Sequence, residues 1–411
     1  MNISQKFKLY DHPAQMEPLL PSEPKLGSLL EQAGDLIRAA DRLAGMCQPG
    51  ALAGLRELLR AMNSYYSNRI EGQHTLPLEI EQALRNDYSK DADKARRQRL
   101  ALAHMATEAQ LEQHSAGAKN GAAPWTAQQV WGAQMVQDIH QDLFARLPDA
   151  DRVLEDGAVL APGVLRTQQV SVGVDAAPAA AQLQEFLARW GGFYSQVRRG
   201  ELQVLAIAAS HQRLVWIHPF RDGNGRVARL HTHLALAHAG LTNGLWSPLR
   251  GLARTHEAYY AHLAAADAHR AGDLDGRGNL SEGALVRWIA YVLVQCADQV
   301  QFMTQMLDLD SMKARIAACL AFEDKVGQHG VRAEALRALH YLFATQGELE
   351  RADFKAMLGL GDRLATTQVS ALLARGLLQS DSPYGKLRFG VPQHALRFYF
   401  PRLWSEAEVG A

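Results

Sequence analysis

The sequence is short of the features that mark several large classes of protein. Its 411 residues include three cysteines, Cys47, Cys296 and Cys319, which are too few and too far apart for a disulfide framework, so we expect buried reduced thiols. The 43 Lys and Arg residues equal the 43 Asp and Glu residues, so no net charge draws the chain to DNA or to an anionic membrane. The sequence has no apolar run of about 18 residues, and its N-terminal segment lacks the apolar core of a signal peptide. These absences predict a cytoplasmic protein with no membrane segment.

Helical periodicity is present over most of the chain. Apolar residues recur at helical spacing from about residue 29 to about residue 325, with glycine-rich breaks. The segments expected to form helices after residue 72 are 77–85, 91–112, 126–144, 178–194, 200–213, 225–239, 256–270 and 281–307. Residues 163–174 alternate apolar and polar side chains and predict a β-hairpin.

The pattern changes after about residue 330. We expect helices at 332–345, 351–358 and 362–376, and then two short strands around residues 382–385. Three helices followed by a small hairpin are typical of a winged helix-turn-helix. Residues 331–411 carry 10 Lys and Arg and 8 Asp and Glu, a net charge of +2 (10 − 8), which is weak for binding DNA phosphates. DNA binding is therefore an alternative that the charge does not favour.

The stretch HPFRDGNGRVAR, residues 218–229, concentrates groups suited to phosphate chemistry. Its proline and glycines prevent a helix until about Asn224, so a loop passes into a helix there. The backbone N–H groups of Gly223, Asn224 and Gly225 can converge at the positive end of that helix. Such an arrangement binds anions, and phosphate above all.

Four side chains of the same stretch add to this anion site. Arg226 and Arg229 are three residues apart, so both project from one face of the helix toward phosphate oxygens. Asp222 lies at the edge of the anion site, where Mg²⁺ could bridge its carboxylate to phosphate. His218 can act as a general base near neutral pH. A Gly-Asn-Gly turn or a histidine alone is common in structural roles, but the combination points to nucleotidyl or phosphoryl transfer.

The whole stretch resembles the signature of the Fic family, HPFx(D/E)GNGRxxR, at every specified position. The resemblance covers about residues 50–300 and implies a mainly α fold, in which a Fic helical core carries a β-hairpin flap, with the winged helix-turn-helix after it. Most Fic proteins transfer AMP from ATP to a hydroxyl group of a target protein. The resemblance therefore implies a protein adenylyltransferase with ATP as substrate, Mg²⁺ as cofactor and an unidentified target protein. The Doc-like branch, which phosphorylates its targets, has lysine where this chain has Gly225.

The resemblance also implies a role for each site residue. His218 would deprotonate a Ser, Thr or Tyr hydroxyl of the target, which attacks the α-phosphate. Asp222 would hold Mg²⁺ against the α- and β-phosphates, Arg226 would contact inner phosphates, and Arg229 would hold the γ-phosphate. The ATP-binding residues implied in this way are Asp222, Gly223, Asn224, Gly225, Arg226, Arg229, Tyr259, Tyr260 and Asp267.

Two of these assignments come from segments outside the motif. Tyr259 and Tyr260, followed by Asp267, resemble a YY…N stretch that lines the adenine side, although aspartate replaces the usual asparagine. Adjacent tyrosines point in different directions on a helix, so one of them can belong to the core. The expected hairpin resembles the family flap, which clamps the target over the nucleotide by strand pairing. The flap residues expected to do this are Val170, Ser171, Val172 and Gly173.

The string SNRIEG, residues 67–72, resembles the inhibitory motif (S/T)xxxE(G/N) of Fic proteins. Ser67 and Glu71 lie one turn apart on the same face of a helix, and Glu71 ends that helix, where a carboxylate needs a cationic partner. If Glu71 pairs with Arg229, the γ-phosphate loses its ligand. The resemblance therefore implies an autoinhibited enzyme.

The predicted organisation is an N-terminal helical region at 1–120 with the inhibitory helix at about 50–72, a Fic core at 121–300, a connecting helix at 301–330 and the winged helix-turn-helix at 331–411. Two alternative functions stay open. One is an ATP-sensing transcription regulator that uses the winged helix, and the other is an enzyme of the same fold that removes AMP. The sequence leaves the oligomeric state open, a homodimer included.

Three histidines, His231, His233 and His238, follow the motif on the same predicted helix. Their spacing is not that of a zinc-binding HExxH helix, and we expect no carboxylate to be placed with them. We therefore expect them to pack or to form hydrogen bonds in the interior.

Overall fold

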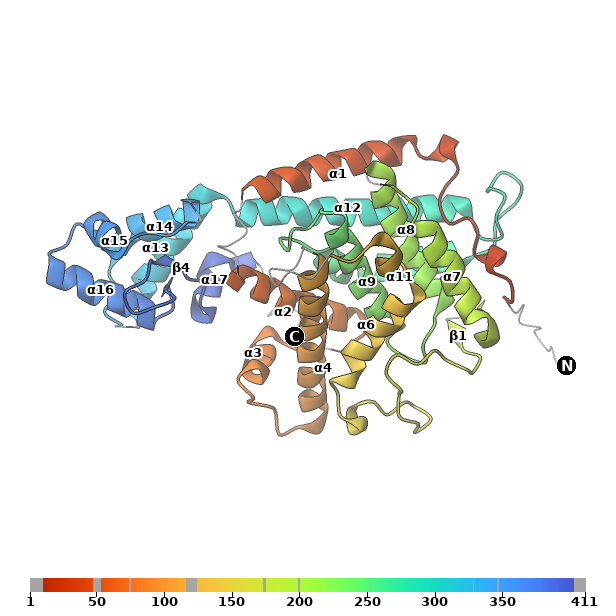
Figure 1. Ribbon diagram of the computed structural model, residues 1–411, viewed down its shortest axis with the longest axis horizontal. Coiled ribbons are helices and arrows are strands. Elements are labelled where there is room, and N and C mark those ends of the chain that lie inside the picture. The colour runs from red at the N-terminus through yellow and green to blue at the C-terminus, as the bar shows by residue number, and fades with distance from the viewer. Residues whose placement is uncertain are drawn as a thin grey trace. The chain divides into compact units, whose positions relative to one another are not determined.

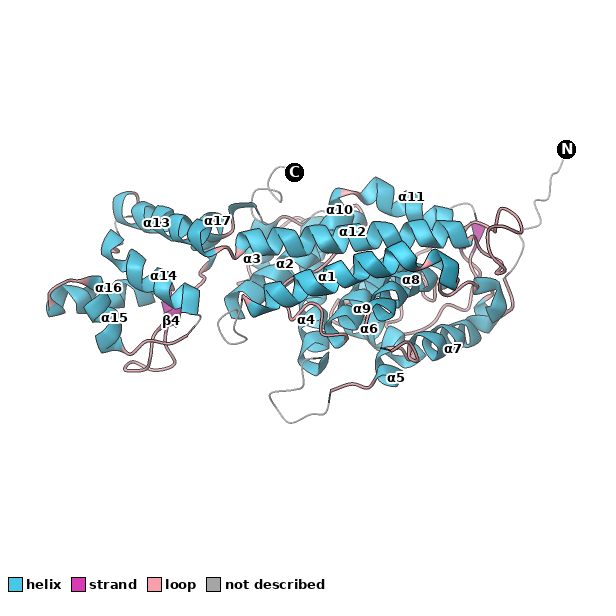
Figure 2. Cartoon of the chain, turned by 90° about the horizontal axis from the view of Figure 1, so that it is seen from above, coloured by secondary structure: helices cyan, strands magenta, loops and turns pink. Residues whose placement is uncertain are grey.

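The structure is a computed structural model that describes residues 10–46, 53–73, 75–115, 124–172, 175–198, 200–327, 329–345 and 347–402 (Figure 1). Over these residues it is mainly helical, as predicted, and the strands form two short hairpins (Figure 2). The described residues fall into two compact units, one drawn from residues 1–40 and 63–299 and the other from 41–62 and 300–411. The domain limits at residues 120, 300 and 330 stay predictions.

The helices that lie wholly or partly in the first unit are α1 (Gly27–Gly45), α2 (Ala53–Ile70), α3 (Pro77–Leu84), α4 (Ala92–Ser115), α5 (Ala127–Val130), α6 (Ala133–Ala145), α7 (Leu183–Tyr194), α8 (Glu201–Ile217), α9 (Asn224–His238), α10 (Leu249–Arg254), α11 (His256–Asp267) and α12 (Glu282–Met306). Helix α9 lies at the centre of this unit, packed against α8, α4 and α6, and α7 covers α8. Trp288 of α12 donates from its ring to the Ala208 carbonyl of α8 at 2.6 Å. Side chains on α9 are therefore almost all buried, polar ones included.

The expected single helix at 126–144 is two helices, α5 and α6, with Gly132 between them. Gly132 has extended backbone angles and is the N-cap of α6. The preceding Trp131 carbonyl packs closely on α7, since a Cβ at Gly191 would lie 2.1 Å from the Trp131 oxygen. The backbone contact with α7 thus explains a break that the apolar periodicity did not reveal. Helix α10 was likewise not predicted.

The second unit contains α13 (Leu309–Lys325), α14 (Leu336–Thr345), α15 (Arg351–Leu358), α16 (Asp362–Ala374), β3 (Leu378–Gln379), β4 (Arg388–Phe389) and α17 (Leu396–Tyr399). Strands β3 and β4 pair antiparallel, and Leu349 forms an isolated bridge with Leu387 beside them. The three helices and the hairpin that the sequence predicts are present here. The assignment of this unit as a winged helix-turn-helix stays a prediction.

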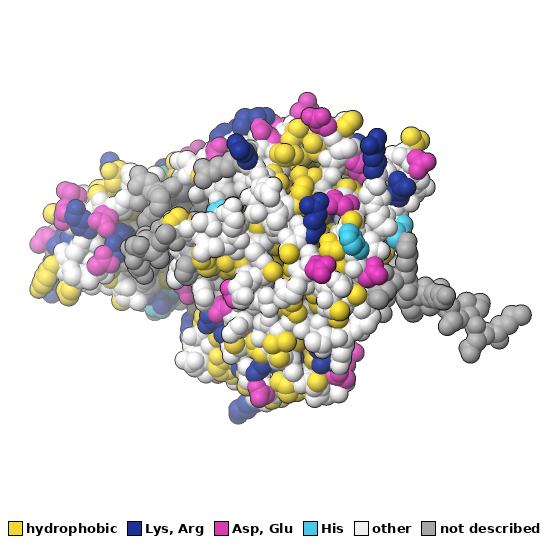
Figure 3. Space-filling view, turned by 45° about the vertical axis from the view of Figure 1, so that its right-hand side comes forward, with side chains coloured by type: hydrophobic (Ala, Val, Ile, Leu, Met, Phe, Trp, Pro, Cys, Tyr) yellow, Lys and Arg dark blue, Asp and Glu magenta, His cyan; other side chains and the backbone are white. Residues whose placement is uncertain are grey.

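Cys296 and Cys319 are buried free thiols, as expected, and Cys47 lies outside the described residues. Among the helices of the described part of the chain, none has the length and apolar character needed to cross a membrane. On the face seen in Figure 3, acidic and basic side chains are interspersed, in keeping with their equal numbers.

Candidate active site

The candidate site is built on the motif loop (residues 218–223), which joins α8 to α9. His218 follows the last residue of α8 with φ 50° and ψ 61°, a left-handed conformation that stops the helix. Gly223 has φ 78°, and a Cβ there would lie 2.4 Å from the Phe144 ring, so only glycine fits. Asn224 closes the loop, because its side chain donates to the Phe220 carbonyl at 2.9 Å and accepts from the Phe220 N–H at 2.8 Å.

His140 of α6 contacts the motif loop and stabilises its conformation. Its ring stacks on Phe220 with centroids 3.9 Å apart. His140 Nδ1 accepts a hydrogen bond from the Gly163 N–H at 2.8 Å, so Nε2 carries the proton and donates to the Asp222 carbonyl at 3.3 Å. Burial lowers the pKa of His140 to about 4, which keeps it in this neutral form. Sequence reasoning missed His140 because it lies 82 residues from Asp222.

The His218 side chain is half-buried in this loop. Burial first, and then the charge of Arg166, lower the pKa of His218 to about 4. Its Nδ1 is buried and has no hydrogen-bond partner among the described residues. The imidazole is therefore neutral at physiological pH and able to accept a proton.

Arg166 ties the stem of the flap to the motif loop. Its side chain is 2% exposed, and its Nε donates to the His218 carbonyl at 2.8 Å. It also donates to the carbonyls of Gln168 at 3.1 Å and Pro178 at 2.5 Å. Burial lowers its pKa to about 10, so Arg166 stays charged. The sequence placed Arg166 in the flap without a role, because its partners are backbone carbonyls that leave no signal in side-chain patterns.

The flap hairpin consists of β1 (Ser171–Val172) and β2 (Asp175–Ala176), which pair antiparallel. Val170 extends it, since its carbonyl accepts from the Ala177 N–H at 3.1 Å. The strands thus begin later than the alternation at 163–174 suggests, because Arg166 holds the first half of that segment against the motif loop. Gly173 lies outside the described residues.

On α9, both arginines of the motif reach the end of α2. Arg229 is 1% exposed and donates from Nε to Ser67 Oγ at 3.0 Å and from Nη2 to the Ser67 carbonyl at 3.1 Å. The same Nη2 donates to Glu71 Oε1 at 2.5 Å. Arg226 Nε donates to Asn68 Oδ1 at 3.3 Å. Two motifs 158 residues apart in the sequence therefore meet in one network.

Glu71 is held by a closed turn at the end of α2. The Gln73 N–H donates to the Asn68 carbonyl at 2.9 Å, the Gly72 N–H donates to the Arg69 carbonyl at 3.0 Å, and Gly72 has φ 70°. These bonds form a Schellman motif, in which Gly72 supplies the left-handed residue. The motif fixes the direction in which the preceding Glu71 side chain leaves the helix.

The Glu71 carboxylate lies over the first turn of α9. A Cβ at Gly225 would be 2.4 Å from Glu71 Oε1, so the carboxylate lies close to the backbone of the helix start where the sequence predicts an anion site. Burial alone would raise the pKa of Glu71, but the charges of Arg229 and Arg226 outweigh it and the pKa is lowered. Glu71 is therefore an anion at neutral pH.

The two adjacent tyrosines of α11 have different environments. Tyr259 is 1% exposed and its hydroxyl lies 2.9 Å from His211 Nε2 in the core. Tyr260 is 46% exposed and donates to the Ile70 carbonyl at 2.9 Å, beside Glu71. Asp267 accepts from Gln212 Nε2 of α8 at 2.5 Å. The structure thus brings Tyr260 to the network at the end of α2, and the adenine contacts of these residues stay predictions.

Asp222 is exposed at the start of α9, and its Oδ1 accepts from the Gly223 N–H at 2.6 Å. One accessible carboxylate beside an anion site suits Mg²⁺, which binds through one or two carboxylates together with substrate phosphates. The residues present therefore fit that ion.

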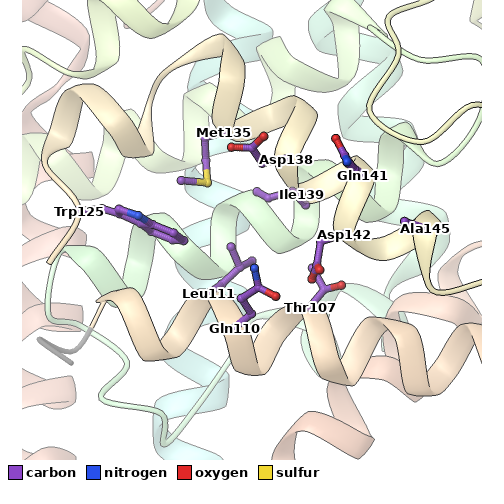
Figure 4. A pocket seen from close by; sticks show the side chains of 10 residues that line it. All are labelled: Thr107, Gln110, Leu111, Trp125, Met135, Asp138, Ile139, Gln141, Asp142 and Ala145. Atoms are coloured by element: carbon purple, nitrogen blue, oxygen red, sulfur yellow. The ribbon is translucent and has the colours of Figure 1, made fainter. Parts of the chain in front are cut away.

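A separate pocket of about 360 Å³ lies between α4 and α6 (Figure 4). Thr107, Gln110 and Leu111 of α4 line one side of it. Asp138 and Asp142 of α6 line the other. Its lining includes no residue of the motif loop.

Comparison with known proteins relates this geometry to a family. The Fic/DOC family model matches residues 131–236, which include the whole stretch 218–229. Protein adenylyltransferase fic-1 of Caenorhabditis briggsae is 36% identical over 126 residues, 30% of this chain and 23% of that protein. Protein adenylyltransferase Fic of Drosophila mojavensis is 34% identical over 109 residues, 26% of this chain and 22% of that protein.

The chain thus spans less than a quarter of the length of these curated relatives. Over a longer range, the crystal structure of a Fic family protein from Desulfovibrio desulfuricans has a TM-score of 0.53 at 18% identity and covers 92% of this chain and 99% of that one, which shows a shared fold. Residues 131–236 therefore match the Fic domain, and the chain as a whole shares its fold with a Fic family protein.

Proposed function

We propose that this chain is a protein adenylyltransferase that transfers AMP from ATP to a Ser, Thr or Tyr hydroxyl of a target protein and of itself. The names of its relatives support this activity. The observation that carries the proposal is the combination of a neutral His218, an exposed Asp222 and two α9 arginines around one helix N-terminus. These groups supply a base, a metal ligand and phosphate ligands within one loop and the first two turns of one helix.

In the proposed reaction, neutral His218 accepts the proton of the target hydroxyl as its oxygen attacks the α-phosphorus. A bond forms between that oxygen and the α-phosphorus, and the bond to the bridging oxygen of the β-phosphate breaks. Pyrophosphate leaves with the developing negative charge, which Arg226, Arg229 and the N-terminus of α9 stabilise. Mg²⁺ held by Asp222 would neutralise further phosphate charge when bound.

We further propose that Glu71 inhibits this reaction. Its carboxylate lies over the first turn of α9 and accepts a hydrogen bond from Arg229 at 2.5 Å, so it competes with a phosphate for the same donors. ATP that binds without this arginine would not present its α-phosphate in line with the hydroxyl. The inhibition thus follows from one anion replacing another at one site.

The proposal is tested by incubating the Glu71→Gly chain with ATP labelled at the α- or the γ-phosphate, alone and with a cell lysate. Protein labelled from the α position only is expected. His218→Ala in the same background should lower the rate by about 10²–10⁴-fold, as for loss of a general base, while ATP affinity stays near that of the parent.

Other outcomes identify the alternatives. Label from the γ position only would mean phosphorylation. Binding of ATP with no labelled protein would favour a sensor, and loss of AMP from a previously labelled protein would favour the reverse activity. Activity that persists in Asp222→Ala with a chelator present would contradict the assignment of Mg²⁺.

A further inference from the structure

A buried cluster of one histidine and two carboxylates joins α4 to α9, outside the motif loop. Glu108 and Glu112 lie one turn apart on α4, and His233 lies on α9. One ligand atom from each residue lies within 4.8 Å of the others. His233 Nε2 is 3.2 Å from Glu112 Oε1 and 3.9 Å from Glu108 Oε1. We propose that this cluster binds a divalent first-row transition metal ion, with Zn²⁺ the best match to its ligands.

The spacing of the ligand atoms suits such an ion. Zn²⁺ bound tetrahedrally to nitrogen and oxygen at about 2.0–2.1 Å holds its ligand atoms roughly 3.3 Å apart. The distance between His233 Nε2 and Glu112 Oε1 is close to this value, while Glu108 Oε1 lies 3.9 Å from His233 Nε2 and would have to move closer. Imidazole and carboxylate are both zinc ligands. Two carboxylates balance the charge of a divalent ion, so His233 can complete the site as an uncharged ligand.

A second histidine, His104, provides an independent indication. It lies one turn before Glu108 on α4, its side chain is fully buried, and neither ring nitrogen has a hydrogen-bond partner among the described residues. His104 Nδ1 points toward the cluster, 3.8 Å from Glu108 Oε2. Asn63 Nδ2 donates a hydrogen bond to Glu108 Oε1, the oxygen nearer His233, at 2.7 Å. Metal-binding carboxylates are positioned by such outer partners, and a small closure of the site would give His104 its hydrogen bond.

The cluster is distinct from the expected magnesium site. His233 lies nine residues after Asn224 along α9, which places it about 14 Å from the first turn of that helix. The ligands also differ in chemistry, since a histidine favours transition metals over Mg²⁺. The expectation that no carboxylate accompanies His233 was wrong, because the carboxylates come from a helix 121 residues earlier.

His231 agrees more closely with the expectation of a packed interior, whereas His238 is half-buried at the end of α9. His231 is 1% exposed, and its Nε2 lies 2.9 Å from the Val130 carbonyl. The ring packs against Trp131 and Trp190. His231 therefore contributes to the core and not to the cluster.

The test measures metal affinity, not transfer. The untagged full chain is stripped with a chelator and titrated with Zn²⁺ in competition with a chromogenic zinc chelator, and Zn²⁺ per chain is determined by elemental analysis. The variant Glu112→Gln replaces one carboxylate ligand with an amide of nearly the same shape. Glu112 is chosen because its side chain, 16% exposed, is the most exposed of the cluster. The matched control is Glu31→Gln, the same change at an exposed site on α1. Asp222→Asn tests the other candidate metal ligand.

We expect one tightly bound Zn²⁺ per chain in the parent, in Glu31→Gln and in Asp222→Asn, with affinity weaker by at least about tenfold in Glu112→Gln. Bound Zn²⁺ should raise the unfolding temperature of the parent more than that of Glu112→Gln. Equal affinity in Glu112→Gln and the parent would mean adventitious binding by other histidines and would overturn the proposal. So would a parent that binds no stoichiometric Zn²⁺, or a loss of binding caused by Asp222→Asn.

Discussion

Each unit of the molecule contains an arginine–glutamate ion pair with one buried partner, but the buried partner is the glutamate in one unit and the arginine in the other. In the second unit Glu323 is the buried partner, fully inaccessible, and Arg375 is 28% exposed. Arg375 holds both oxygens of Glu323, at 2.6 and 3.0 Å, and His329 lies 2.9 Å from the same carboxylate. In the first unit Arg229 is the buried partner at 1% exposed, while Glu71 is 26% exposed and contributes one oxygen.

The difference separates a structural ion pair from a displaceable one. Loss of one partner of a buried carboxylate destabilises the fold, because it leaves an anion that water cannot reach. Arg229 keeps two hydrogen bonds to Ser67 even without Glu71, so another anion can take the place of the carboxylate. The geometry of each pair thus predicts whether its loss affects stability or activity.

Arg375→Ala should have the largest effect on stability. We expect the free energy of unfolding of the second unit to fall by about 3 kcal/mol, the lower end for a broken buried pair, since His329 remains beside Glu323 and Arg375 is partly exposed. Urea denaturation measures the change. The control is Arg388→Ala, which breaks surface pairs with the exposed Asp381 and Glu348 and should cost less than about 1 kcal/mol. Equal effects of the two substitutions would contradict a structural role for the buried pair.

Glu71→Gly should raise the rate of AMP transfer by roughly 5–150-fold, the usual range for a coupling between two sites. The freed Arg229 then binds the γ-phosphate, so ATP should also raise the unfolding temperature of this variant more than that of the parent. Labelled AMP incorporation and thermal unfolding with and without ATP measure the two effects.

Arg229→Ala provides the control for this effect as a double-mutant cycle. If Glu71 acts through Arg229, then Glu71→Gly should gain little in the Arg229→Ala background. The same fold-increase with and without Arg229 would show that Glu71 inhibits by another route.

Gly72→Ala should have a smaller effect in the same direction. Gly72 has φ 70° and no atom lies within 4 Å of a Cβ there, so the change strains the Schellman motif without a clash, at a cost of about 1 kcal/mol. A loosened turn should release Glu71 part of the time and raise transfer a few-fold. The control is Gly330→Ala, which also has positive φ and open space but lies in the second unit. If both variants keep the parent rate, the turn does not hold Glu71 in its inhibitory position.

The smallest change is expected on varying pH. The pKa of His218 is lowered to about 4, so this base is neutral throughout the range from about pH 8 to pH 5 and becomes protonated only below it. Transfer by Glu71→Gly should therefore be nearly constant over that range and fall as the pH approaches 4. A midpoint near 6.5 for His218, measured by transfer at saturating ATP, would contradict the burial of this base in the working enzyme.

Much of this arrangement could be predicted from local patterns. The helical spacing of apolar residues predicts α3, α4, α9 and α12 closely, because it reflects which face of each helix is buried. It could not predict the break at Gly132, where a backbone contact with α7 decides the geometry. The hairpin begins later in the sequence than expected for a similar reason. Arg166 donates hydrogen bonds to the backbone carbonyls of His218 and Pro178, and these bonds hold the segment before the strands in place.

By itself, the sequence determined those parts of the site whose residues lie within a few positions of one another along the chain. The loop of residues 218–223, the anion site at the start of α9 and the one-turn spacing of Ser67 and Glu71 all follow from backbone conformations and helical periodicity, which act within a few residues. Only the tertiary structure decided which of Arg229 and Glu71 is buried, that His140 supports the motif loop, and that Glu108 and Glu112 surround His233. Burial and long-range pairing depend on how α4, α6 and α9 pack, and packing brings together residues that no local pattern connects.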